Sequence, residues 1–136
     1  MPPMVRKEAV ITIAEFGDEV LIVKKVDDGT SLMSDKWHLP GETKNGDEPD
    51  EKAVRRGILE EAGVLVTGIV YLTTSESPKG TLLKWYRCDA LTRLIIPGDD
   101  AVDGQWADKD NVAYVCDTEA VAMWPQEIRK YFGLVD

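Results

Sequence analysis

The chain has 136 residues, the length of one domain, and its hydrophobic fraction of 43% and charged fraction of 30% are ordinary for a globular protein. Its 25 acidic and 16 basic residues give a formal net charge of −9, which disfavours a duplex nucleic-acid partner because such binders need a basic surface. No apolar run approaches the ~18 residues that span a bilayer, so we expect one domain over residues 1–136 without a membrane partner.

Strand patterns occur on both sides of one long helical segment. The segments with strand composition are Glu8–Glu15, Glu19–Lys25, Trp37–Leu39, Val64–Thr74, Thr81–Arg93 and Gln105–Ala107. Gly17-Asp18 predicts a hairpin between the first two, and Pro40-Gly41 ends the third. Polar loops are predicted at Asp27–Asp35 and Glu42–Asp47, and a turn containing Pro78 and Gly80 joins the fourth and fifth strands.

A helix is predicted from about Pro49 to Ala62. Proline suits the first turn of a helix, and Gly63 suits the left-handed residue that closes one. Apolar residues recur every four positions and predict a core-facing side, namely Val54, Ile58 and Ala62. A second helix is predicted over Pro125–Phe132, and the order of elements indicates a mixed α/β (α+β) sandwich.

Several carboxylates converge near the first predicted helix. Glu60 and Glu61 share a face with position 57, and Glu48 lies at the helix entrance. Like charges this close repel one another unless a cation lies among them, and Mg²⁺ or Mn²⁺ with oxygen ligands would supply it. A solvated acidic helix face is the alternative that spacing alone leaves open.

The segment around this helix resembles the Nudix box, G-x5-E-x7-R-E-U-x-E-E-x-G-U, in which U is a bulky aliphatic residue. Counted back from the closing glycine, the matching positions are Glu48, Arg56, Ile58, Glu60, Glu61, Gly63 and Val64. Leu39-Pro40-Gly41 is similar to the family's usual entry to the box. The resemblance implies a single Nudix domain, an α/β/α sandwich with a mixed β-sheet.

Two positions depart from the box. Glu42 stands where the box has its first glycine, and Gly57 stands where it has a glutamate. In the family that glutamate is a metal ligand and is often assigned as the general base. Gly57 is therefore open to three interpretations: lost turnover, a base supplied from another loop, or close packing at the small-residue patch that Ala53 and Gly57 form.

The resemblance implies metal-dependent hydrolysis of a pyrophosphate bond in a nucleoside diphosphate derivative, with Mg²⁺ or Mn²⁺ as cofactor. Glu60 and Glu61 would be metal ligands, and Arg56 would complete the catalytic set by holding a loop or an acidic partner. The other implied roles are close approach to the substrate for Gly41, and a structural role for Glu48 and Gly63.

Acids outside the box are candidates to replace the missing glutamate, namely Asp99, Asp100, Asp103 and Glu76. The family often places a further metal-binding acid in this later region, although a polar surface loop is the plain alternative. The stretch 99–110 also matches part of a calcium-loop pattern, which is weakened by Ala101 at the third place and by the missing flanking helices.

Two other functions remain open at this stage. Gly57 favours a non-catalytic Nudix-fold module that binds or senses a nucleotide, whereas the retained acids favour the hydrolase. The isomerase branch of the fold needs a cysteine and extra histidines, and His38 is the one histidine in the chain. The nucleotide is not identified, and a homodimer is an open possibility because dimers are frequent among relatives.

Cysteine use and the first residues bear on location in the cell. Cys88 and Cys116 are far apart and fit no metal or redox spacing, which predicts a reduced chain. Met1–Val10 contains no apolar signal core. We therefore expect a cytoplasmic protein.

Overall fold

The computed structural model describes residues 6–29 and 33–134. Its strands are β1 (Glu8–Phe16), β2 (Glu19–Lys25), β3 (Trp37–His38), β4 (Gly41–Thr43), β5 (Val66–Glu76), β6 (Leu82–Ala90) and β7 (Ala101–Asp108). Its helices are α1 (Asp50–Ala62), α2 (Val112–Val115), α3 (Thr118–Ala122) and α4 (Gln126–Tyr131), with a 3-10 turn at Lys109–Asn111. Two stretches of the sequence predictions lie outside the described residues. They are residues 1–5 of the segment Met1–Val10, for which no signal core is predicted, and residues 30–32 of the predicted loop Asp27–Asp35.

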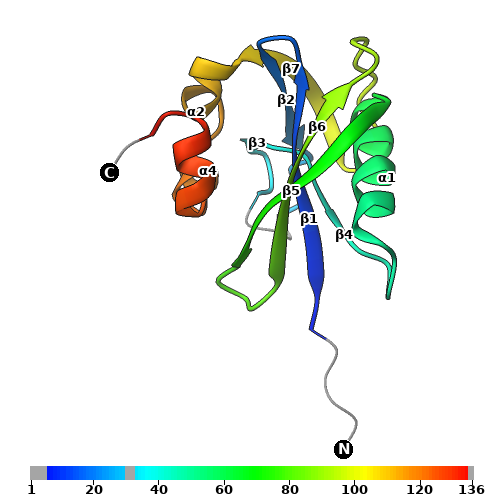
Figure 1. Cartoon of the computed structure of the whole chain (residues 1–136), viewed down its shortest axis with the longest axis vertical. Coiled ribbons are helices and arrows are strands. Elements are labelled where there is room, and N and C mark those ends of the chain that lie inside the picture. Colours follow the sequence, from blue (N-terminus) through cyan, green and yellow to red (C-terminus); the bar gives the residue numbers. More distant parts are fainter. Residues whose placement is uncertain (1–5, 30–32, 135–136) are drawn as a thin grey trace, which may run out of the picture.

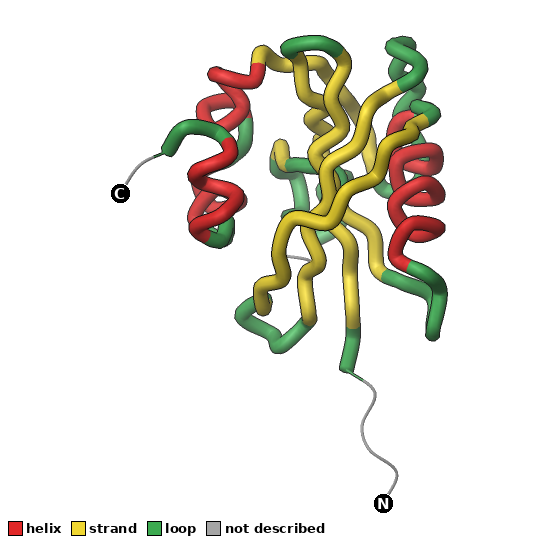
Figure 2. The backbone as a smooth tube through the Cα atoms, in the orientation of Figure 1, coloured by secondary structure: helices red, strands yellow, loops and turns green. Residues whose placement is uncertain are grey.

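The strands form one mixed sheet in the order β3-β2-β1-β6-β5, with β4 paired to β1 and β7 paired to β2. The β1–β6 pair is parallel, and the other pairs are antiparallel. Helix α1 covers one side of the sheet, and α2 and α4 cover the other (Figures 1 and 2). The predicted α/β/α sandwich with a mixed sheet is confirmed.

Strand β2 shows how the sheet holds two cores. Val20 and Ile22 pack in the core on the side of α2 and α4, whereas Leu21 and Val23 pack against Ile58 on the side of α1. Successive side chains of a strand point to opposite faces, so a strand covered on both sides is apolar throughout. The uninterrupted apolar run in β2 therefore follows from its central place between two helical layers.

The local signals predict α1 almost to the residue. Gly63 closes the helix with a left-handed φ of 68°, and its amide donates to the Leu59 carbonyl oxygen at 2.9 Å. Pro49 precedes the first helical residue instead of lying in the first turn, and its carbonyl oxygen accepts from Ala53 at 3.1 Å. Both ends of α1 are thus fixed by chemistry that the sequence displays.

Two strands correct the sequence predictions. Gly41–Thr43 forms β4 inside the predicted loop, because it pairs with β1 from Ala9 to Ile11. Strand β7 is longer than the predicted Gln105–Ala107 because it pairs along β2, so Asp103 lies on a strand and the calcium-loop interpretation is wrong. Among the helices that the structure describes, none has the length and apolarity needed to cross a membrane.

Candidate functional site

Arg56 clamps the entrance of α1 to the helix body. Its Nε and Nη2 donate to the two carboxylate oxygens of Glu48, each at 3.0 Å, and Nη2 also donates to the Thr43 carbonyl oxygen at 2.9 Å. This two-point contact is the strong form of a charge-assisted hydrogen bond. The hydrogen bond from Arg56 lowers the pKa of Glu48 to about 2. The arrangement joins β4, the following loop and α1 into one unit.

Glu61 is the most deeply buried acid of the predicted set. Its exposed fraction is 3%, and its Oε1 has no hydrogen-bond partner among the described residues. Burial and the negative charges of Glu42 and Asp100 raise its pKa well above the usual value. A buried polar atom without a hydrogen-bond partner lowers the stability of a folded protein. A ligand from outside the chain would give this oxygen a partner.

Glu42 on β4 faces the helix at the position of the missing glutamate. A Cβ built on Gly57 would lie 2.7 Å from the Cβ of Glu42 and 3.2 Å from its Cγ. Real Cβ atoms do not approach a neighbour this closely, so glycine at 57 is what admits the Glu42 side chain. The small-residue patch predicted at Ala53 and Gly57 is therefore occupied from the sheet. Burial is the main cause that raises the pKa of Glu42, and Arg56 opposes it.

The segment before β7 brings a further acid to the cluster. The amides of Ile96 and Gly98 donate to the carbonyl oxygens of Ala62 and Glu61, at 2.8 and 3.2 Å, which docks the segment on the end of α1. A carboxylate oxygen from each of Glu42, Glu60 and Asp99 then lies within 4.8 Å of the other two. Three elements distant in sequence thus contribute one acid each.

Cations in and around the cluster leave two of its acids unpaired. Lys25 Nζ pairs with Asp100 Oδ2 at 2.6 Å, and Arg56 Nη1 lies 3.5 Å from Glu42 Oε1 and 3.3 Å from Glu60 Oε2. Neither Glu61 nor Asp99 has an ion pair within the described part of the chain. The cluster therefore carries an excess of negative charge.

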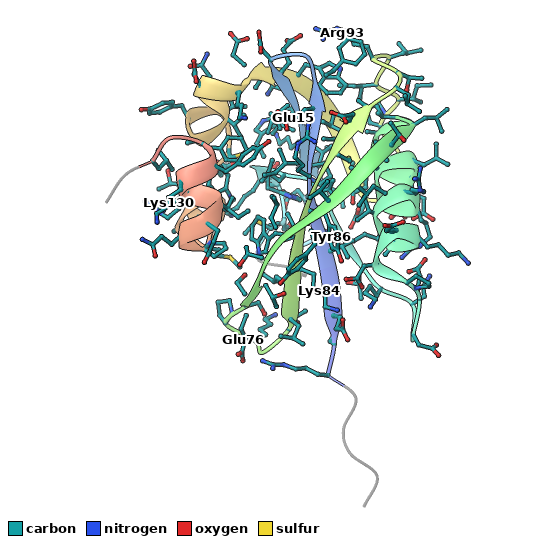
Figure 3. The ribbon with its side chains drawn as sticks, viewed as in Figure 1. Glu15, Glu76, Lys84, Tyr86, Arg93 and Lys130 are labelled. Carbon is teal, nitrogen blue, oxygen red and sulfur yellow. The ribbon has the colours of Figure 1, made fainter. Side chains whose placement is uncertain are left out.

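The remaining predicted residues lie in different places. Asp103 on β7 accepts from the Gly104 amide at 2.8 Å and lies opposite Lys24 of β2. Glu76 pairs with Arg6 at 2.6 Å, at the end of β5 that lies away from the site (Figure 3). Of the four candidate replacement acids, the structure brings Asp99 into the cluster and Asp100 to its edge, and it leaves Asp103 and Glu76 out.

A cavity of about 390 Å³ opens beside the acids, and Glu42, Lys25 and Asp100 form part of its wall. Trp85 and Trp124 form part of its apolar wall, and Gly41 lines both this cavity and a narrow packing gap between β4 and α1. A Cβ on Gly41 would make ordinary contacts at 3.6 Å, so sterics do not demand glycine there. The volume is in the range of small-molecule sites.

His38 is a second buried group on this wall. Its Nδ1 donates to the Leu39 carbonyl oxygen at 2.5 Å, and its Nε2 has no partner among the described residues. Burial lowers the pKa of the ring, so the neutral form is favoured and Nε2 remains an acceptor. The structure places this histidine on the wall of the cavity.

Sequence reasoning missed Glu42 as a site residue. Its signal was present, because Glu42 and Gly57 depart from the box in opposite senses: an acid replaces a glycine, and a glycine replaces an acid. Their exchange becomes meaningful only when β4 is placed against α1. As a donor set, the carboxylates of Glu42, Glu60 and Asp99 fit a hard divalent cation, and the unpartnered oxygen of the neighbouring Glu61 also favours one.

No protein-family model matches the sequence, and no curated protein matches it significantly. Among solved structures, the chain is similar to a NUDIX hydrolase from Nitrosomonas europaea, with a TM-score of 0.68 and 22% identity over 78% of this chain and 59% of that one. A MutT NUDIX hydrolase from Burkholderia pseudomallei matches with a TM-score of 0.69 and 17% identity, over 98% of this chain and 100% of that one.

The NUDIX domain of Shewanella oneidensis NrtR, solved with ADP ribose, matches with a TM-score of 0.68 and 20% identity, over 82% of this chain and 79% of that one. Coverage is lower for the MutT/nudix family protein from Enterococcus faecalis, since the chain spans 46% of its length. These likenesses show that the chain has the fold of these proteins.

Proposed function

We propose that this chain, which has the Nudix fold, is a hydrolase that cleaves a pyrophosphate bond in a nucleoside diphosphate derivative and needs Mg²⁺ or Mn²⁺. The observation that carries the proposal is the group of Glu42, Glu60 and Asp99, whose carboxylate oxygens lie within 4.8 Å of one another, together with the buried Glu61, whose Oε1 has no hydrogen-bond partner among the described residues. A cation between these carboxylates and a diphosphate would offset the repulsion between their negative charges.

Each residue of the site has a distinct task in this proposal. Glu60 and Glu61 project from one turn of α1 and hold the cation, which when bound neutralises the diphosphate and lowers the pKa of bound water. Arg56 keeps Glu48 and the Thr43 carbonyl in place, so that α1 and β4 keep their separation. Positioning and electrostatics of this kind supply most of the rate in phosphoryl-type transfers.

The cavity supports a nucleotide as the ligand. Ile11, Met33 and Met123 on its wall offer partly exposed apolar surface to a base. Lys7, Lys25 and Lys79 on the same wall offer positive charge to phosphate groups. The NrtR domain was solved with ADP ribose, a nucleoside diphosphate derivative. ADP-ribose is therefore the first compound to test on this chain.

The test is hydrolysis of ADP-ribose, dinucleoside polyphosphates, nucleotide sugars and nucleoside triphosphates, each with Mg²⁺ or Mn²⁺. We expect metal-dependent turnover, and we expect Glu61→Gln to lower it by about 100-fold or more because the side chain that holds the cation loses its charge. Glu51→Gln is the matched control, since it removes an exposed carboxylate from the same helix. Turnover by Glu61→Gln at the parental rate would contradict the assignment of the site.

A binding module without turnover is the second candidate, and Gly57 is the observation that favours it. Calorimetric titration with ADP-ribose separates the two functions. Binding without hydrolysis of any compound in the panel would assign the chain to this second class, and hydrolysis would exclude it.

A further inference from the structure

We infer that Glu42 supplies, from β4, the metal-binding carboxylate that the Nudix box places on α1 at the position of Gly57. The inference rests on the proposed function, because it assigns a ligand to the same cation site. It departs from the box, in which the position of Glu42 is a glycine and contributes no side chain.

The first step of the inference is steric. Glu42 lies opposite Val10 in the β1–β4 pairing, which turns its side chain toward α1, and the space it enters is the space that a side chain at position 57 would fill. A Cβ at 57 and the Cβ of Glu42 would be 2.7 Å apart, so the two positions cannot both carry a glutamate without movement of β4 or α1. Glu42 therefore places a carboxylate in the space where the box has its glutamate, but from β4 and not from α1.

The second step concerns where the carboxylate ends. An oxygen of Glu42 lies within 4.8 Å of oxygens of Glu60 and Asp99, a spacing that allows all three to reach one ion. Arg56 Nη1 lies 3.5 Å from Glu42, but it also pairs with Glu60, and Nε and Nη2 of the same guanidinium bind Glu48. The positive charge available to Glu42 is therefore shared. Arg56 thus holds one side of the Glu42 carboxylate, and the carboxylates of Glu60 and Asp99 lie close to it on the other.

The third step is independent of the cluster's spacing. Glu61 is 97% buried, and its Oε1 has no hydrogen-bond partner in the described part of the chain. Glu42, Gly57 and Glu61 line one narrow packing gap between β4 and α1. A divalent cation between these two carboxylates would offset their mutual repulsion and would give the unpartnered Glu61 oxygen a ligand to bind.

The test measures binding of Mn²⁺ alone, by titration calorimetry and by the loss of the free-ion signal in electron paramagnetic resonance. We expect Glu42→Gln to weaken Mn²⁺ binding by about 10-fold or more, as Glu61→Gln does, because a charged oxygen ligand becomes an amide. The double variant Glu42→Gly with Gly57→Glu returns the acid to α1, and we expect it to recover Mn²⁺ binding. Glu51→Gln controls for loss of one unit of negative charge.

Each result has a definite meaning. Parental Mn²⁺ affinity in Glu42→Gln would overturn the inference, and so would failure of the folded double variant to exceed Glu42→Gly. If circular dichroism shows that Glu42→Gln is unfolded, the comparison of Glu42→Gly with the double variant decides by the same criterion. Mn²⁺ binding that depends on Glu42, in a chain that hydrolyses nothing, would uphold the inference and contradict the proposed hydrolysis. Absence of Mn²⁺ binding by the parent would overturn both.

Discussion

Glu15 on β1 and Glu61 on α1 are both largely buried glutamates, but their surroundings differ in charge. Glu15 accepts hydrogen bonds from Arg87 Nε at 2.7 Å and from the Tyr131 hydroxyl, and Lys109 Nζ lies 3.7 Å from it. Figure 3 shows Glu15 on the sheet, away from α1. The charged groups that act most strongly on Glu61 are the acids Glu42 and Asp100, and Lys25 acts on it more weakly.

The difference appears in the pKa values of the two groups. Burial raises the pKa of Glu15, but the bonds from Tyr131 and Arg87 outweigh it and the net pKa is lowered. Burial and the neighbouring acids act in the same direction on Glu61, and its pKa is raised. Side chains of the protein thus compensate the charge of Glu15. They do not compensate the charge of Glu61, which a bound cation would balance in the proposed site. Unbalanced buried charge is therefore a better guide to this site than charge density.

The largest expected effect on stability comes from binding of the cation. If Glu61 and its neighbours bind Mn²⁺, the ion stabilises the folded chain by RT ln(1 + [L]/Kd), which is about 2.7 kcal/mol at a hundredfold excess over Kd. We expect Mn²⁺ to raise the melting temperature of the parent and of Glu15→Gln equally, and to raise that of Glu61→Gln less. Thermal melts with and without Mn²⁺ measure this, and an equal shift in all three chains would contradict it.

The next effect concerns the paired glutamate. Glu15→Gln removes the negative charge to which Arg87 and Tyr131 donate hydrogen bonds. We expect the free energy of unfolding to fall by about 2 kcal/mol. Because the pKa of Glu15 is lowered on folding, its contribution is present above the unfolded value of 4.5 and is lost as the pH falls below it. Urea unfolding of the parent and the variant at several pH values tests both statements, with Glu51→Gln as a surface control.

Glu61→Gln, in the presence of a chelator, should change stability in the opposite direction. Glu61→Gln removes a carboxyl group whose ionisation the fold disfavours, and we expect it to stabilise the metal-free chain by about 1 kcal/mol at neutral pH. The pKa of Glu61 is raised on folding, so stability is lost as the pH rises through the folded value, and the advantage of the variant disappears below 4.5. A metal-free Glu61→Gln chain that unfolds more easily than the parent would show that the carboxylate has an internal partner.

Much of the fold could be predicted because its signals are local. Gly63 and the fourfold apolar spacing define α1 within a residue of its observed bounds, and the β1–β2 hairpin follows from Gly17-Asp18. Strand β4 was missed because its three residues become a strand only through pairing with β1. The length of β7 likewise depends on a partner distant in the sequence.

The site also combines residues that local spacing predicts with residues that only tertiary contacts bring together. Arg56, Glu60 and Glu61 lie on one helix, and the box-like spacing predicts that they lie together. Asp99 joins them only because the segment before β7 docks on the end of α1, which no spacing encodes. Glu42 was passed over because its relation to Gly57 is a contact between two elements and not a distance along the chain.

The smallest expected effect tests that contact. Alanine in place of glycine within a helix ordinarily stabilises a protein by about 0.5–1 kcal/mol. In Gly57→Ala the new Cβ meets the Cβ of Glu42, which cannot move without β4, so we expect a net loss of about 0.5–1 kcal/mol instead. In the Glu42→Gly background the obstacle is gone, and the same substitution should stabilise the chain. Urea unfolding of the four chains of this cycle gives the coupling between the two positions. A coupling of zero would mean that the Glu42 side chain does not occupy the space beside Gly57.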